Sequence, residues 1–212
     1  MRVKEIIVEG AQHPIIVVDV QPEYVKYGGY STQDTCKEII NFVQKQTGPV
    51  LMFVNAEHTG VSDDTVQSIK QYWEETVNGE PVYDKEYGDY VAPDQQINWS
   101  RFRVVDKGYG YFRSWLDYGI TPATIIRVIR AMYQAKITDS RDLPDLEKIV
   151  GDEWEPRMYE DSLSVKWTSI AQLKRFNNAY LVGGGRDECL REVELLMNAF
   201  NISYKRIDRL VY

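Results

Sequence analysis

Three ionisable side chains of this sequence follow apolar runs that are predicted to form buried strands. Asp19 ends the run "IIVVD", Lys107 follows "RVVD", and Cys189 lies just beyond "AYLVGGG". Ligands of parallel α/β sheets bind at the carboxyl ends of the strands, so we expect the three groups to lie close together. Such a site suits nucleophilic chemistry: the carboxylate takes the thiol proton, the ammonium favours the thiolate, and backbone N–H groups hold an oxyanion.

The glycine-rich segment "LVGGGRDECL" strengthens the case for Cys189 as the nucleophile. Glycines without Cβ atoms let the backbone approach a ligand closely. If Asp187 is the N-cap of the following helix, Cys189 lies in its first turn, where the helix dipole lowers the pKa of a thiol.

Each of the three residues also has a purely structural interpretation. A cysteine at a strand-to-helix junction is commonly a small buried hydrophobe, an aspartate after a strand is often a turn or N-cap residue, and a lysine is mostly solvated. The position of all three at the ends of predicted strands favours the catalytic interpretation and leaves the structural one open.

The elements that would position these residues alternate along the chain. Short apolar, β-branched runs are typical of strands covered on both faces. They occur at 15–20, 50–55, 102–107, 179–184 and 202–207. Helices are predicted between them, at 31–45 with Ser31 as N-cap, from Ser62 to Val77, and at 187–200. This alternation predicts a three-layer α/β/α fold with a mainly parallel sheet.

Two segments interrupt the alternation. Residues 79–98 are rich in Tyr, Asp, Pro and Gly and indicate a long surface excursion. Residues 120–167 begin with a helix that has Thr121 as N-cap and Pro122 in first position, and continue as a polar, irregular stretch. We interpret 120–167 as an insertion over one end of the sheet within a single domain of 1–212. It is either a lid or oligomer contact, or a surface embellishment without catalytic contact.

Composition excludes several classes of protein. The 212 residues are 43% hydrophobic and 12% aromatic, which is enough for a real core. The net charge of −7 argues against nucleic acid or an anionic membrane as the main partner. The two cysteines, Cys36 and Cys189, form no CxxC pair, and from the sequence pattern we expect neither a signal peptide nor a membrane span. We therefore expect a cytoplasmic protein, and the aromatic residues of 79–118 leave homo-oligomerisation open.

Three motifs together resemble the isochorismatase-like cysteine hydrolases, the family of nicotinamidases and N-carbamoylsarcosine amidohydrolases. "IIVVDVQPEY" is similar to the opening motif, a strand ending in Asp, then any residue, Gln and an aromatic. "VVDKGYGYF" resembles the second, a Lys after the third strand, and "LVGGGRDECL" the third, a strand, a Gly and a Cys that opens a helix. The resemblance covers 14–118 and 168–207 and leaves 120–167 unmatched.

The resemblance implies a parallel sheet of order 3-2-1-4-5-6, whose sixth strand would here be short or missing unless "RLVY" supplies it. It implies hydrolysis of an amide-like C–N bond of a small molecule through a thioester. By matched position, Asp19 would be the general base, Lys107 the group that polarises the site, and Cys189 the nucleophile.

The same resemblance implies further site residues. A non-proline cis peptide would lie at Gly184-Gly185 and would aim the N–H of Gly185, with that of Cys189, at the oxyanion. Substrate aromatics would come from Tyr24, Tyr109 and Phe112, although Phe112 suits a core position at least as well.

One departure from the family concerns metal binding. Nicotinamidases bind a metal through an Asp-x-His pair after the second strand, whereas this chain has "VNAEHTG", with Ala56 where the Asp would fall. Asn55, Glu57 and His58 would have to improvise a site, so we predict neither a metal nor another cofactor.

Two alternatives to a hydrolase remain. The first is a non-catalytic binding or assembly domain that kept the fold and the three residues. The second is a nucleotide-binding protein that cradles phosphate with "GGGRDE", which is disfavoured because neither GxxxxGK[ST] nor GxGxxG is present.

Overall fold

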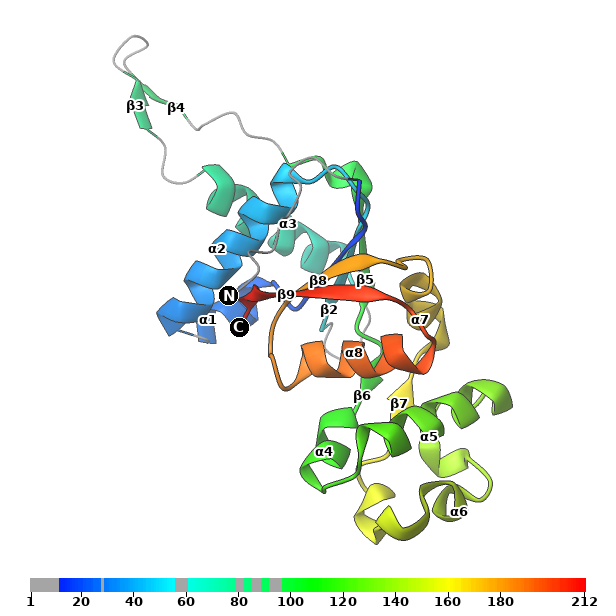
Figure 1. The fold of residues 1–212 in the computed structure, drawn as a ribbon. Coiled ribbons are helices and arrows are strands. Elements are labelled where there is room, and N and C mark those ends of the chain that lie inside the picture. Colours follow the sequence, from blue (N-terminus) through cyan, green and yellow to red (C-terminus); the bar gives the residue numbers. More distant parts are fainter. Residues whose placement is uncertain (1–11, 28, 56–60, 79–81, 85–88, 92–96) are drawn as a thin grey trace, which may run out of the picture.

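The computed structural model of the chain describes residues 12–27, 29–55, 61–78, 82–84, 89–91 and 97–212 (Figure 1). Its centre is a parallel sheet with the strand order β5-β2-β1-β8-β9. The strands are β1 (Ile15–Val18), β2 (Val50–Val54), β5 (Phe102–Asp106), β8 (Ala179–Gly183) and β9 (Tyr204–Val211). Counted along the chain, this order is 3-2-1-4-5, which confirms the predicted α/β fold and its topology.

The sheet strands form because their side chains are buried on both faces. All residues of β1, β2 and β8 are buried. Alternate residues of β1 belong to two different clusters, with Ile16 and Val18 in one and Ile15 and Val17 in the other. Continuous apolar runs are the expected sequence of such doubly covered strands.

One face of the sheet is covered by α1 (Pro22–Tyr27), α2 (Gly29–Lys45) and α3 (Asp63–Asn78). Helix α2 begins before Ser31, so the prediction of Ser31 as its N-cap is wrong. The Ser31 carbonyl instead accepts the Thr35 hydroxyl at 3.0 Å within the helix. Ser62 does cap α3, because its Oγ accepts the N–H of Thr65 at 3.1 Å.

The opposite face is covered by α7 (Trp167–Leu173) and α8 (Cys189–Ala199). The predicted apolar stripe of α8 is buried at Leu190, Val193 and Met197 and half-buried at Phe200. Within the described residues, no helix is long and apolar enough to span a membrane.

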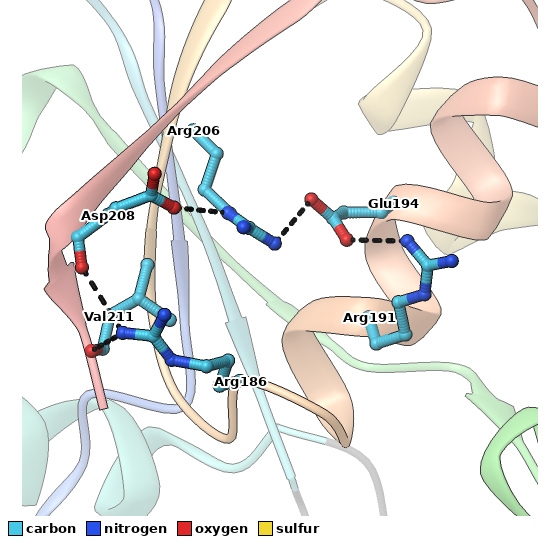
Figure 2. Close-up of polar contacts among 6 residues, drawn as sticks. All are labelled: Arg186, Arg191, Glu194, Arg206, Asp208 and Val211. Carbon is cyan, nitrogen blue, oxygen red and sulfur yellow. Dashed lines mark hydrogen bonds and ion pairs between the residues drawn. The ribbon is translucent and has the colours of Figure 1, made fainter.

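The edge strand β9 is joined to α8 by ion pairs (Figure 2). Arg206 lies 3.2 Å from the buried carboxylate of Glu194 and 2.7 Å from that of Asp208. Glu194 also pairs with Arg191 at 3.1 Å. Charged side chains on an edge strand hinder the addition of a further strand. The segment "RLV" continues β9 itself and pairs Val211 with Gly183, so it is not a sixth strand.

The insertion leaves and rejoins the sheet domain through a short antiparallel pair, β6 (Tyr109–Gly110) with β7 (Ser164–Val165). Residues 111–163 between these strands form what we call the inserted lobe, so it begins earlier than the predicted residue 120. The lobe contains α4 (Phe112–Asp117), α5 (Pro122–Ala135) and α6 (Leu146–Val150), and the 3-10 turns Ser140–Asp142, Gly151–Glu153 and Pro156–Met158.

The inserted lobe packs against α8 and shares its core cluster (Figure 1). Ile125, Ile129 and Met132 of α5 lie in that cluster, and Arg130 donates to the carbonyl of Ala199 at 2.7 Å. Thr121 caps α5 as predicted, since its side chain accepts the N–H of Thr124.

A further 3-10 turn, Trp99–Arg101, precedes β5. Of the predicted excursion at 79–98, the structure describes the hairpin of β3 (Val82–Asp84) and β4 (Asp89–Val91), and Ile97 and Asn98.

Candidate active site

Asp19 directly follows β1 and has a left-handed backbone with φ of +55°. This conformation is uncommon for a residue with a side chain. The N–H of Asp19 donates to the carbonyl of Phe53 at 3.0 Å. The Asp19 carbonyl accepts the N–H of Gln21 at 2.9 Å and the hydroxyl of Tyr212 at 2.8 Å. Backbone strain held by its surroundings in this way is typical of functional sites.

The Asp19 carboxylate is buried and poorly partnered. Among the described residues, neither of its oxygens accepts a hydrogen bond of normal geometry. Burial raises its pKa from 3.8 to about 6, although the Cys189 thiol and the Lys107 ammonium oppose the rise. A carboxyl group with a pKa near neutrality can both accept and return a proton, which suits general base and acid catalysis.

Lys107 directly follows β5 and continues its backbone pairing with β2, because its N–H donates to the carbonyl of Val54 at 2.8 Å. Its Nζ donates to the Cys189 sulfur at 2.9 Å and lies 2.8 Å from Oε2 of Glu192. Burial alone would lower the pKa of Lys107. The nearby charges, first of all that of Glu192, outweigh burial and raise it. The lysine is therefore an ammonium at neutral pH.

Cys189 is the first residue of α8 and is half-buried. Glu188, not Asp187, takes the N-cap position and makes no side-chain cap, so the prediction of Asp187 as N-cap is wrong. The Gly185 carbonyl accepts the N–H groups of Glu188 and Leu190. The helix therefore begins one residue later than it would with Asp187 as its N-cap.

The pKa of the Cys189 thiol is raised to about 12, so the prediction that the helix position would lower it is wrong. Burial and the charge of Asp19 raise the pKa more than Lys107 lowers it. The resting site therefore holds a thiol rather than a thiolate. The structure brings Lys107 and Cys189 into contact and places Asp19 in their electrostatic field. We refer to these three residues as the trio.

The peptide bond between Gly184 and Gly185 is trans, so the prediction of a cis bond there is wrong. Gly183 turns the chain instead, with φ of +118°, and a Cβ at this position would lie 2.1 Å from the Val18 carbonyl oxygen. The N–H of Gly184 still bonds to that oxygen at 3.0 Å. Gly183 thus allows the backbone of β8 to lie close to that of β1, whereas the close approach to a ligand stays a prediction.

A cavity of about 550 Å³ is lined by two members of the trio, Asp19 and Cys189, while Lys107 lies behind the Cys189 sulfur and is not among the lining residues. Its volume suits a small molecule. Its walls come from the end of β1, α1, α2, α4, the turn before α8 and the end of the chain. The lining residues are Asp19, Tyr24, Thr32, Arg113, Gly185, Arg186, Asp187, Glu188, Cys189 and Tyr212.

The three aromatic residues expected to contact substrate lie in different places. Tyr24 lines the cavity, and its hydroxyl accepts the side-chain N–H of Asn55 at 2.7 Å. Phe112 has no exposed surface and belongs to the core. Tyr109 is also buried; its ring lies 5.0 Å from the Lys107 ammonium, and its hydroxyl has no hydrogen-bond partner among the described residues.

Several residues at the site were not predicted from the sequence. Gln21 bonds to the N–H of Asn55 at 3.1 Å and so ties the turn after β1 to the end of β2. Arg186, on the cavity rim, donates to the carbonyls of Asp208 and Val211, which fixes the turn before α8 to the edge strand (Figure 2). Glu192 contacts Lys107. Two of them had a sequence signal: Gln21 is part of the motif "IIVVDVQPEY", and Glu192 follows Cys189 by one helical turn.

The stretch expected to hold a metal in nicotinamidases cannot be compared, because Ala56, Glu57 and His58 lie outside the described residues. Within the part of the chain that the structure describes, no three His, Cys, Asp or Glu side chains are grouped as metal ligands. The absence of a metal stays a prediction.

The geometry thus supplies a proton acceptor, a cation and a thiol beside a cavity of small-molecule size. Comparison of the chain with models of protein families, with curated proteins and with solved structures found no match.

Proposed function

We propose that this protein is a cysteine hydrolase of the isochorismatase-like type, which cleaves an amide-like C–N bond of a small molecule through a thioester on Cys189. One observation carries the proposal: Lys107 donates to the Cys189 sulfur at 2.9 Å beside the unpartnered, buried carboxylate of Asp19. Buried polar groups without partners are rare and costly, so their retention at a cavity favours a functional role.

The first half of the reaction forms the thioester. Asp19 accepts the Cys189 proton as the sulfur bonds to the substrate carbonyl carbon. The N–H of Cys189, at the start of α8 where amides lack intrahelical partners, is available to the developing oxyanion. The C–N bond then breaks, and the protonated Asp19 returns its proton to the leaving nitrogen. Because the thiol pKa is about 12, proton removal has to accompany attack rather than precede it.

The second half of the reaction consumes one water molecule. Asp19, again a carboxylate, accepts a proton from water as the water oxygen bonds to the acyl carbon. The C–S bond breaks, the proton passes to the sulfur, and the acid product leaves. Lys107 stays charged throughout and stabilises negative charge on the sulfur in both halves.

This chemistry needs a reduced thiol, and both cysteines are free. We therefore propose a cytoplasmic location, a small molecule as partner and no nucleic-acid ligand. Whether the chain forms a homo-oligomer stays a prediction.

The alternative of a catalytically inactive binding domain is favoured by one observation, the raised pKa of the Cys189 thiol. Alkylation with iodoacetamide separates the two functions. A hydrolase requires Cys189 to react much faster than Cys36 at neutral pH, and Asp19→Asn or Lys107→Ala to slow that reaction. Turnover of amides and ureido compounds should vanish in Cys189→Ala. Equally slow labelling of both cysteines, without turnover, would favour the binding domain.

A further inference from the structure

Glu192 is a buried carboxylate at the trio that belongs to none of the three sequence motifs. It lies on α8 three residues after Cys189, so both side chains occupy one face of the helix. The Glu192 side chain is only 5% exposed. A buried carboxylate needs charged and hydrogen-bonding partners, and its two oxygens have different ones.

The first oxygen of Glu192 contacts the ammonium that contacts the nucleophile. Lys107 Nζ lies 2.8 Å from Glu192 Oε2 and 2.9 Å from the Cys189 sulfur. The ammonium is thus held at two points by one helix. A lysine has a flexible four-carbon stem, so the sulfur, a weak acceptor, is a poor anchor for it. The carboxylate is the stronger of the two anchors.

The second oxygen of Glu192 is bound by the inserted lobe. Glu192 Oε1 accepts the backbone N–H of Arg113, in the first turn of α4, at 3.2 Å. The guanidinium of Arg113 in turn forms an ion pair with Glu188, immediately before Cys189. Helix α4 therefore contacts α8 on both sides of the nucleophile.

We propose that Glu192 is a positioning residue, which holds the Lys107 ammonium against the Cys189 sulfur while α4 of the inserted lobe holds Glu192. The proposal rests on the proposed function, because it assigns Glu192 a role in the same site. It also gives the inserted lobe a role at that site, because the lobe completes the support of the trio rather than merely decorating one end of the sheet.

Glu194 provides a matched control on the same helix. Glu192 and Glu194 are both glutamates, both 4% exposed, and both form ion pairs with basic side chains. Glu194 pairs with Arg191 of α8 and Arg206 of the edge strand β9 (Figure 2), whereas Glu192 pairs with Lys107. A general weakening of α8 should therefore follow from a change at either position, whereas an effect on the thiol should follow only from a change at Glu192.

The test compares Glu192→Asp with Glu194→Asp by the rate of Cys189 alkylation with iodoacetamide at pH 7.5, measured by peptide mass spectrometry. Aspartate keeps the charge but is one methylene shorter, so it draws the ammonium away from the sulfur. Weaker stabilisation of the negative charge that develops on the sulfur slows its attack. A loss equivalent to about one pKa unit is about tenfold in rate, and we expect that loss in Glu192→Asp alone. In a Lys107→Met background, Glu192→Asp should have no further effect, because its action passes through the ammonium.

A folded Glu192→Asp protein that alkylates at the wild-type rate overturns the proposal, and so does an equal loss in Glu194→Asp. These results leave the proposed function intact as long as wild-type Cys189 reacts faster than Cys36. If wild-type Cys189 is as slow as Cys36, the proposed function itself fails.

A second variant keeps the proposal testable if Glu192→Asp does not fold. In Glu192→Gln, Lys107 loses the charge that chiefly opposes the effect of burial, so its amine should become neutral more readily. We expect faster acetylation of Lys107 by acetic anhydride at pH 8 than in wild type or Glu194→Gln. Unchanged protection of Lys107 in Glu192→Gln would contradict the proposal.

Discussion

The substitution Asp19→Asn should make the protein more stable at neutral pH, and the gain should depend on pH. Asp19 is 2% exposed, and its carboxylate oxygens have no hydrogen-bond partner among the described residues. Ionising such a group in the folded state costs free energy that an asparagine of the same shape does not. The wild-type residue therefore lowers the stability of the fold where it is charged.

The size of this effect on stability follows from the pKa of Asp19, which burial raises from 3.8 to about 6. Between these values the folded state binds more protons than the unfolded state, so the free energy of unfolding falls as the pH rises. The contribution of Asp19 to the free energy of unfolding is fully present below pH 3.8 and is lost by the time the pH has passed 6. A difference of roughly 2 pKa units, at about 1.36 kcal/mol each, amounts to about 3 kcal/mol.

Urea unfolding of wild type and Asp19→Asn at intervals from pH 4 to pH 8 measures this effect. The difference in unfolding free energy between the two proteins should grow by about 3 kcal/mol in favour of Asp19→Asn and level off above pH 7. Asp187→Asn is the control, because Asp187 lines the same cavity but is exposed to solvent. A difference that stays constant with pH, or grows equally in the control, would refute the claim that Asp19 is a buried, strained charge.

Three further predictions concern the trio and its supports. The rate of Cys189 alkylation should rise through pH 6 and then level off, because Asp19 must be ionised to accept the thiol proton; a profile without a change near pH 6 would exclude Asp19 as the base. Gly183→Ala should prevent folding or cost several kcal/mol in urea unfolding, because its Cβ would meet the Val18 carbonyl at 2.1 Å; wild-type stability would contradict the positive φ. Tyr212→Phe should cost about 1 kcal/mol and slow alkylation, because the hydrogen bond to the Asp19 carbonyl is lost; an unchanged alkylation rate would show that this bond does not position the carboxylate.

The sheet could be predicted from the sequence because its strands are short and buried on both faces. Runs such as 15–18 and 50–54 are short and apolar throughout, which favours buried strands over helices, and the alternation with helices favours parallel pairing. The extent of β9 could not be predicted, since an edge strand carries charged residues that look like a loop. Its ion pairs with Glu194 of α8 depend on the fold as a whole.

The site could be predicted only as far as the alignment of strand ends allows. Parallel register places residues after β1, β5 and β8 at one edge, which is why Asp19, Lys107 and Cys189 could be selected. The pKa of the thiol could not be predicted, because it depends on how burial and two opposite charges balance in three dimensions. The role proposed for Glu192 was hidden for a related reason: an acidic residue on a helix is ordinarily solvated, and its contacts with Lys107 and with the backbone of Arg113 depend on the fold.

The hydrogen bond between the hydroxyl of Tyr212 and the carbonyl of Asp19 joins residues 193 positions apart in the chain. Contacts of such long sequence separation form late in folding, after the loop between them has closed. During synthesis, the backbone of Asp19 cannot receive this support until residue 212 has left the ribosome. Until then Cys189 keeps the ordinary pKa of a thiol, so completion of the fold both suppresses ionisation of the resting thiol and supplies the proton acceptor that activates it.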